Sequence, residues 1–376
     1  MVEDLFNTVF QRATGLGAPY RYQRKLALKG PAVPKLLDIP TGLGKTAAAV
    51  LAWLWRRRFA DESIRKQTPR RLVYCLPMRV LVEQTFAETV LWLDRLGLLA
   101  GSATWENTRD EELPTRSSRL VQYEPNPADE TPVGWAGKHG DQGTHRIAVH
   151  LLMGGEERTD WALWPERDAV LIGTQDMLIS RVLNRGYAAG RARWPLEFGL
   201  LNSDCLWVFD EIQLMDTSLA TSLQVDAWRQ CLELRPSRDA FPTKNEKHLP
   251  KPCHSLWMSA TMARHWLERA VDWAPRVEAA WNDRLHLKEG TNSQQRSGEL
   301  FQIKKSLSKA GIGSLKKPSK KKNQADKSDA EKKQTKYLTQ LADHLCKPDN
   351  HASTGLTLVI MNTVDRATEL FKLLKN

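Results

Sequence analysis

A glycine-rich turn, Pro-Thr-Gly-Leu-Gly-Lys-Thr at residues 40–46, separates a short apolar run from a long helical pattern. The run at 35–39 contains Leu and Ile, as a strand buried on both faces does, and residues 46–58 repeat apolar side chains at helical spacing. A strand, a glycine turn and a helix in this order are the building unit of open α/β sheets. The chain is therefore expected to fold around a sheet whose first helix begins at this turn.

Short apolar runs and helical patterns alternate as far as residue 271. They predict strands at 35–39, 72–76, 147–152, 169–172, 206–209 and 255–258, and helices at 46–58, 79–95, 175–184, 217–234 and 262–271. This alternation predicts an α/β fold with a mostly parallel sheet. Residues 101–144 have weak periodicity and are expected to be a long surface insertion. The three arginines at 56–58 are expected to be a solvated helix end.

The positive charge is concentrated in one segment. The 376 residues carry a net charge of +11, and residues 301–336, with twelve Lys, no Arg and three acids, carry +9 of it. The tract is polar and almost free of aromatics, so it predicts a linker, either in contact with nucleic-acid phosphates or merely solvated. We expect a first domain at 1–285, a Lys-rich linker or insertion at 286–337, and a further strand and helix, at 355–362 and 364–374, within 338–376.

Composition excludes several classes of protein. The longest apolar run is too short to cross a membrane, and the N-terminus has no apolar segment behind a basic start, so we expect a cytoplasmic protein without membrane partners. The five cysteines form no Cys-x-x-Cys pair, which favours reduced, buried thiols over a metal site.

The glycine turn is predicted to bind a nucleotide. Backbone N–H groups at a helix N-terminus form an anion cradle, and glycines let the backbone approach the phosphates. Lys45 is expected to reach the β and γ oxygens of ATP, and the Thr46 hydroxyl to bind Mg²⁺. Ile39 replaces the first glycine of the full P-loop pattern. The predicted nucleotide-binding residues here are Thr41, Gly42, Leu43, Gly44, Lys45 and Thr46.

Two carboxylates follow the apolar run at 205–209. Asp210 is expected to bind Mg²⁺, and Glu211 to orient and deprotonate the attacking water, so with Lys45 they form the predicted catalytic set. The tripeptide Ser259-Ala260-Thr261 ends the strand predicted at 255–258.

These segments, in this order, resemble the superfamily 2 DExH/D-box helicases. Residues 42–46 are similar to motif I of that family, 76–85 to motif Ia, 173–176 to motif Ib, 210–213 to motif II and 259–261 to motif III. The resemblance covers most of residues 20–265 and implies a RecA-like P-loop NTPase domain that uses ATP and Mg²⁺. It also implies that Ser259 and Thr261 couple the nucleotide state to the grip on nucleic acid.

The resemblance assigns further roles. Arg79 and Thr174, with the turn at Gly154 and Gly155, are implied to contact the nucleic-acid backbone. Gln23 lies in a segment similar to the family's adenine-reading Gln motif, although a plain helix residue is an open alternative. Residues 357–374 resemble only the truncated start of a second RecA-like domain.

Within that superfamily the chain looks most like the CRISPR-associated helicases of type I interference systems. Residues 38–46, 152–155 and 209–216 carry this resemblance. It implies ATP-driven 3′→5′ translocation on single-stranded DNA in antiviral defence, and recruitment by an RNA-guided surveillance complex. None of the nine histidines is followed by Asp, so the family's HD nuclease signature is absent from this sequence.

The later helicase motifs, including an arginine on the second motor domain, are also absent from the sequence, so the chain alone is expected to hydrolyse ATP weakly. Two other functions remain open. One is a nucleotide-dependent DNA-binding module without productive turnover, and the other is the motor of a restriction or repair system.

Overall fold

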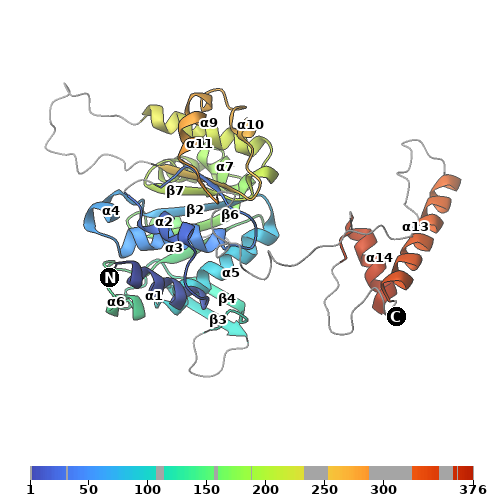
Figure 1. Ribbon diagram of the computed structural model, residues 1–376, viewed down its shortest axis with the longest axis horizontal. Helices are drawn as coiled ribbons and strands as arrows, with labels where there is room; N and C mark the ends of the chain where they lie inside the picture. Colours follow the sequence, from blue (N-terminus) through green and yellow to red (C-terminus); the bar gives the residue numbers. More distant parts are fainter. Residues whose placement is uncertain are drawn as a thin grey trace. The chain divides into compact units, whose positions relative to one another are not determined.

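The computed structural model describes residues 2–30, 33–106, 114–155, 160–187, 189–232, 253–287, 324–346, 359–361 and 363–375. The chain divides into two compact units, Met1–Ser297 and Gly298–Asn376. Figure 1 shows the elements of each unit, which are described separately below.

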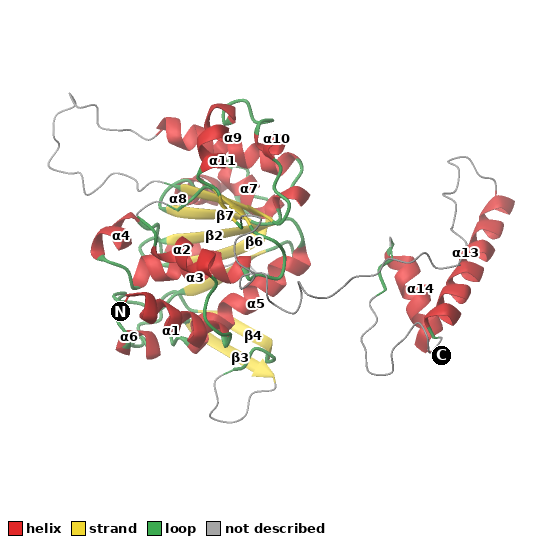
Figure 2. Ribbon diagram, in the orientation of Figure 1, coloured by secondary structure: helices red, strands yellow, loops and turns green. Residues whose placement is uncertain are grey.

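The first unit is built on one seven-stranded sheet in which every neighbouring pair is parallel. Figure 2 shows its strands in yellow. The strand order is β5-β6-β2-β7-β8-β1-β9. The strands are β1 (Leu36–Asp38), β2 (Arg71–Leu76), β5 (Ala148–Leu152), β6 (Ala169–Thr174), β7 (Cys205–Phe209), β8 (His254–Ser259) and β9 (Leu285–His286). The six predicted strands are confirmed, and the α/β, RecA-like P-loop fold is present. The two-residue β9 was missed because so short a strand has no periodicity to detect.

Helices cover both faces of this sheet, because side chains alternate between its faces. In β2, Leu72 and Tyr74 belong to one hydrophobic core, while Val73 and Cys75 belong to another. The first core packs against α1 (Val2–Thr14), α2 (Arg21–Leu28), α3 (Lys45–Arg58) and α5 (Arg79–Arg95). The second packs against α7 (Gln175–Val182), α8 (Trp194–Leu201), α9 (Thr217–Leu232), α10 (Arg264–Leu267) and α11 (Val277–Asn282).

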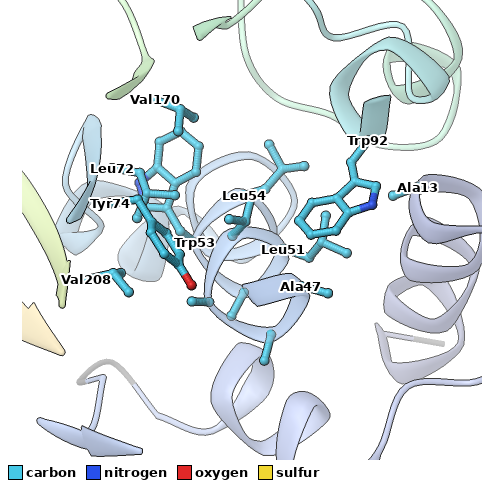
Figure 3. Packing of buried hydrophobic residues seen from close by; sticks show 14 of the residues in the cluster. Ala13, Ala47, Leu51, Trp53, Leu54, Leu72, Tyr74, Trp92, Val170 and Val208 are labelled. Carbon is cyan, nitrogen blue, oxygen red and sulfur yellow. The ribbon is translucent and has the colours of Figure 1, made fainter. Parts of the chain in front are cut away.

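The helix that follows the glycine turn is the centre of the first core. Figure 3 shows Trp53 of α3 beside the sheet residue Tyr74, and Trp92 of α5 beside Leu51 of α3. Trp53 is buried and its indole N–H donates to Pro69 O at 2.8 Å. Burial of a large side chain stabilises a fold by about 1.5–3 kcal/mol, so these contacts fix α3, and with it the turn, against the sheet.

The segment expected to be a surface insertion contains a β-hairpin. Strands β3 (Gly101–Glu106) and β4 (Arg119–Pro125) pair antiparallel, and a short helix, α6 (Trp135–Lys138), follows them. Leu120 and Tyr123 of β4 pack on the first core. A surface insertion is compatible with this separate two-stranded sheet, in which no strand residue is buried, but the hairpin itself was not predicted, because its polar strands shift register at Thr104/Trp105.

The arginine run at 56–58 is not a solvated helix end. Arg56 and Arg58 are buried. Arg58 makes two bonds of 2.7 Å to the carboxylate of Asp141, and Arg57 Nε lies 2.8 Å from Asp168 Oδ1. The expectation was wrong because the acids that neutralise these arginines lie far along the chain and are brought in by folding.

Among its described residues, the first unit also contains α4 (Glu62–Gln67) and 3₁₀ turns at Trp161–Leu163, Arg191–Arg193, Ile212–Leu214 and Ala274–Arg276. The predicted helix at 262–271 is reduced to the single turn α10. The described part of the chain contains no helix long and apolar enough to cross a membrane.

The second unit contains α13 (Gln324–Leu345) and α14 (Val364–Lys375), which pack through Leu338, Ala342 and Leu370. Helix α14 confirms the helix predicted at 364–374. Helix α13 corrects the end of the predicted linker, because residues 324–337 are helical and rich in the helix formers Ala, Lys, Gln and Glu. Residues 288–323 of that linker lie outside the described residues. So does most of the strand predicted at 355–362, and its described residues, 359–361, are not assigned to a strand.

Candidate functional site

The turn between β1 and α3 needs both of its glycines. Gly42 and Gly44 have φ angles of 80° and 71°, a region that side chains disfavour. A Cβ atom on Gly44 would also lie 3.0 Å from Nε2 of Gln23. The turn therefore places Lys45 as the first residue of α3, with the N–H groups of that helix end beside the turn.

A cavity of about 840 Å³ opens beside this turn. Its lining brings together all the residues predicted to bind the nucleotide, the metal ion or the attacking water. These lining residues are Gln23, Thr41, Gly42, Leu43, Gly44, Lys45, Thr46, Asp210 and Glu211, whereas Ser259 and Thr261 do not line the cavity. Phe10, Leu16, Leu91 and Trp92 add an apolar lining, so the cavity has the size and mixed character of a small-molecule site.

Lys45 and Glu211 face each other across the site. The Lys45 side chain is buried, and its Nζ lies 3.7 Å from Oε1 of Glu211. A buried ammonium requires an anion nearby. The lysine predicted to bind phosphate is therefore buried and lies close to the predicted catalytic carboxylate.

Asp210 is held rigidly at the end of β7. The Tyr74 hydroxyl donates to Oδ2 at 2.7 Å, and the Glu211 N–H donates to Oδ1 at 2.8 Å. Burial raises the pKa of Asp210 to about 6, which these hydrogen bonds and Lys45 oppose. Tyr74 was missed in the sequence. The available signal was a single tyrosine in the aliphatic run of β2, the strand that pairs with β7.

A hydrogen-bond chain joins Glu211 to the tripeptide that ends β8. The Gln213 amide donates to Oε2 of Glu211, and Ser259 Oγ donates to Oε1 of Gln213 at 2.8 Å. The Thr261 N–H in turn donates to Ser259 Oγ at 3.0 Å. The predicted coupling residues are therefore connected to the predicted catalytic carboxylate through Gln213, whose role was not predicted from the sequence.

The backbone at Glu211 is unusual. Its φ of 52° and ψ of 46° lie in the left-handed region, which is costly for a residue other than glycine. Such conformations persist only where surrounding contacts impose them. In this conformation the Glu211 side chain accepts a hydrogen bond from Gln213 and lies near Lys45.

Gln23 is bonded on both sides of its amide. Its Nε2 donates to Gly44 O at 3.0 Å, and its Oε1 accepts from the Tyr20 N–H at 2.8 Å. Beside it, the Tyr22 hydroxyl donates to Leu43 O at 2.6 Å. Both residues hold the glycine turn in place, so in this structure Gln23 positions the turn while also lining the cavity.

The four predicted nucleic-acid contacts gather at the carboxyl edge of neighbouring strands. Leu76 of β2 is in register with Thr174 of β6, and Leu152 of β5 is in register with Gly173. Arg79 follows β2, and Gly154 and Gly155 follow β5. A Cβ atom on Gly155, whose φ is 90°, would lie 4.0 Å from Nη2 of Arg79. The exposed Arg79 therefore lies close to the glycine turn.

The oxygen groups of the cavity fit Mg²⁺. Asp210 is buried, and the raised pKa indicates a carboxylate that a cation would stabilise. Hydroxyl and carboxylate oxygens, such as those of Thr46 and Asp210, are suitable ligands. Within the described ranges no cluster of three or more His, Cys, Asp and Glu would hold a metal alone.

Residues 25–122, which include the glycine turn, match the DEAD/DEAH box helicase family. No curated protein has a sequence that matches the chain. Two crystal structures of the DUF1998 helicase MrfA, one bound to DNA and one bound to DNA and AMPPNP, are each 14% identical, with TM-scores of 0.40 and 0.39. They match 72% and 71% of this chain, which covers 28% of the length of each, and at this similarity they carry no argument about function.

Proposed function

We propose that this chain is the motor of an ATP-dependent DNA helicase or translocase, which binds Mg·ATP in the cavity beside the glycine turn. The observation that carries the proposal is the meeting of Lys45, Asp210 and Glu211 in that cavity. The match of residues 25–122 to the DEAD/DEAH box helicase family supports it independently.

The chemistry follows from the lining groups. Lys45 faces the β- and γ-phosphates and stabilises their charge. Glu211 orients a water molecule towards the γ-phosphorus and accepts its proton, while the bond from that phosphorus to the β–γ bridging oxygen breaks. Mg²⁺, held by Thr46 and Asp210, supplies neutralisation of the phosphate charge when it is bound.

Coupling to nucleic acid is proposed to run through Gln213. Any movement of Glu211 between nucleotide states is transmitted to Ser259 and Thr261, because one hydrogen-bond chain joins them. Arg79, Thr174 and the Gly154–Gly155 turn are proposed to hold the sugar-phosphate backbone of single-stranded DNA. Contacts of this kind position a strand without reading its sequence.

The test compares nucleotide binding with turnover in the parent chain and in Glu211→Gln. The amide keeps the shape of the side chain but accepts no proton, so Mg·ATP should bind while hydrolysis stops. Steady-state ATPase activity should rise when single-stranded DNA is added to the parent chain. Nucleotide binding without any turnover in the parent would favour a DNA-binding module, and absence of nucleotide binding would overturn the proposal.

A finer proposal is that the motor acts in the cytoplasm in CRISPR type I interference, moving 3′→5′ and recruited by an RNA-guided surveillance complex. Residues 38–46, 152–155 and 209–216 support it. The test is co-purification with such a complex assembled on target DNA. ATPase activity that responds to free single-stranded DNA but not to the complex would favour a restriction or repair motor instead.

A further inference from the structure

The nucleotide cavity has a set of lining groups that the proposed chemistry does not use. Gln84 and Glu88 come from α5, and Arg116 comes from the turn that precedes β4. Arg116 belongs to none of the sequence motifs described above. It lines the same cavity as Lys45, Asp210 and Glu211 although it lies on the hairpin, outside the parallel sheet.

The charges of the cavity explain why this arginine matters. Two cations, Lys45 and Arg116, stand against three carboxylates, Glu88, Asp210 and Glu211. A polyphosphate entering such a site is repelled unless the cations face it. Lys45 is already close to Glu211, whereas Arg116 makes no hydrogen bond or ion pair with any residue that the structure describes. Arg116 is therefore available to an anionic ligand.

The hairpin that carries Arg116 is anchored to the first core. The Tyr123 hydroxyl donates to Ala100 O at 2.7 Å and accepts from the Val149 N–H at 3.2 Å. Trp105 Nε1 donates to Asp94 Oδ2 on α5 at 2.8 Å. Both strands are anchored in this way, and Arg116 lies three residues before the first residue of β4.

The turn around Arg116 is itself closed by hydrogen bonds. The Ser118 N–H donates to Thr115 O at 3.0 Å, and the Thr115 N–H donates to Ser118 Oγ at 2.9 Å. The charge of Arg116 reaches the cavity lining. Burial raises the pKa of Glu88, and the guanidinium of Arg116 is one of the groups that oppose this rise. Glu88 and Arg116 form no ion pair, so the guanidinium of Arg116 is free to donate to a ligand.

We propose that Arg116 is a phosphate-binding residue of this cavity, donating to nucleotide phosphate oxygens beyond the α position. A guanidinium presents N–H groups in a planar fork that matches two phosphate oxygens, which an ammonium does not. This inference rests on the proposed function, since it requires that the cavity take a nucleoside triphosphate. It adds a cation from the hairpin to the one that the glycine turn supplies.

The experiment measures binding of Mg·ATP and of AMP to the full chain by calorimetry. Arg116→Ala should raise the Kd for Mg·ATP about ten-fold or more and leave the Kd for AMP within about two-fold. Arg116→Lys should recover part of the loss, because it keeps the charge and loses the fork. Arg119→Ala is the matched control, since Arg119 lies on the same hairpin, pairs with Glu106 and does not line the cavity.

The outcomes separate this inference from the proposed function. If Lys45→Ala weakens Mg·ATP binding and Arg116→Ala does not, the cavity is a nucleotide site and the role of Arg116 is wrong. Equal losses for ATP and AMP in Arg116→Ala would place the arginine at the base or ribose and would also overturn it. If the parent chain binds no nucleotide, the proposed function fails first.

Discussion

At the scale of single residues, Asp210 is the group of the nucleotide cavity whose charge its surroundings affect strongly. Burial raises its pKa from 3.8 to about 6. Between about pH 4 and pH 6, Asp210 is therefore mostly protonated in the folded protein and mostly ionised in the unfolded chain. Stability falls as pH rises through this window, and the full cost is present above about pH 6. A pKa shift of this size lowers the free energy of unfolding by at most about 3 kcal/mol.

We predict that Asp210→Asn stabilises the nucleotide-free protein. At pH 8 its free energy of unfolding should exceed that of the parent by up to about 3 kcal/mol, and the difference should vanish near pH 4. Asparagine keeps one oxygen that accepts from Tyr74, but its amide nitrogen cannot accept from the Glu211 N–H, so loss of that bond offsets part of the gain. Urea unfolding followed by tryptophan fluorescence at both pH values measures this. Asp272→Asn, at an exposed position, is the control, and a less stable Asp210→Asn at pH 8 would refute the argument.

The residues that the sequence did not reveal share a physical cause. Lys45, Asp210 and Glu211 were predictable because each follows a strand at a fixed offset within a local motif. Tyr74 and Gln213 each need a partner that lies far along the chain, Asp210 after β7 for Tyr74 and Ser259 of β8 for Gln213. No local pattern reports such pairs, since they arise when the sheet forms.

At the scale of elements, the bridge between β7 and β8 depends on one side chain. We predict that Gln213→Ala keeps Mg·ATP affinity within about three-fold but removes most of the stimulation of ATPase activity by DNA, because Glu211 and Ser259 are no longer joined. Steady-state ATPase with and without single-stranded DNA is the measurement. Gln122→Ala, on the exposed face of β4, serves as the control. Normal stimulation in Gln213→Ala would show that coupling takes another route.

The end of α3 gives a second prediction at this scale. Arg58 and Asp141 form a pair whose side chains are 2% and 0% exposed. Asp141→Asn should lower the free energy of unfolding by about 3–5 kcal/mol, because it leaves a buried guanidinium with less compensation. Glu62→Gln, which removes the exposed pair with Lys66, should change it far less, because solvent screens that pair. Denaturant titration compares the two, and equal effects would contradict the role of burial.

The elements themselves were largely predictable. Strands of a parallel sheet are buried on both faces and appear in sequence as continuous apolar runs, so β1, β2, β5, β6, β7 and β8 were found. The β3–β4 hairpin has only one face on the core, and its weaker pattern was missed. The order of the strands in the sheet has no local signal at all, because it depends on how the connecting helices cross over.

At the scale of the whole molecule, the charge distribution gives a prediction about nucleic acid. Residues 301–323 carry eight lysines and no acid. Deleting them should reduce the slope of log affinity for single-stranded DNA against log salt, because fewer counterions are released, while Mg·ATP affinity stays unchanged. Replacement by a neutral segment of equal length is the control. An unchanged slope would indicate that the lysines are merely solvated and that binding depends on the loops around Arg79.

Strand order has one more consequence for the molecule. Strand β8 lies between β7, which Asp210 follows, and β1, which leads into the glycine turn. Neighbouring strands are spaced about 4.8 Å apart, so the two strands that carry the halves of the nucleotide site lie two spacings, or about 10 Å, apart. Lys45 spans that interval with its long side chain to approach Glu211. Strand β8 thus sets the distance between the two halves of the nucleotide site, and its last residue is Ser259, which is predicted to couple the nucleotide state to nucleic acid.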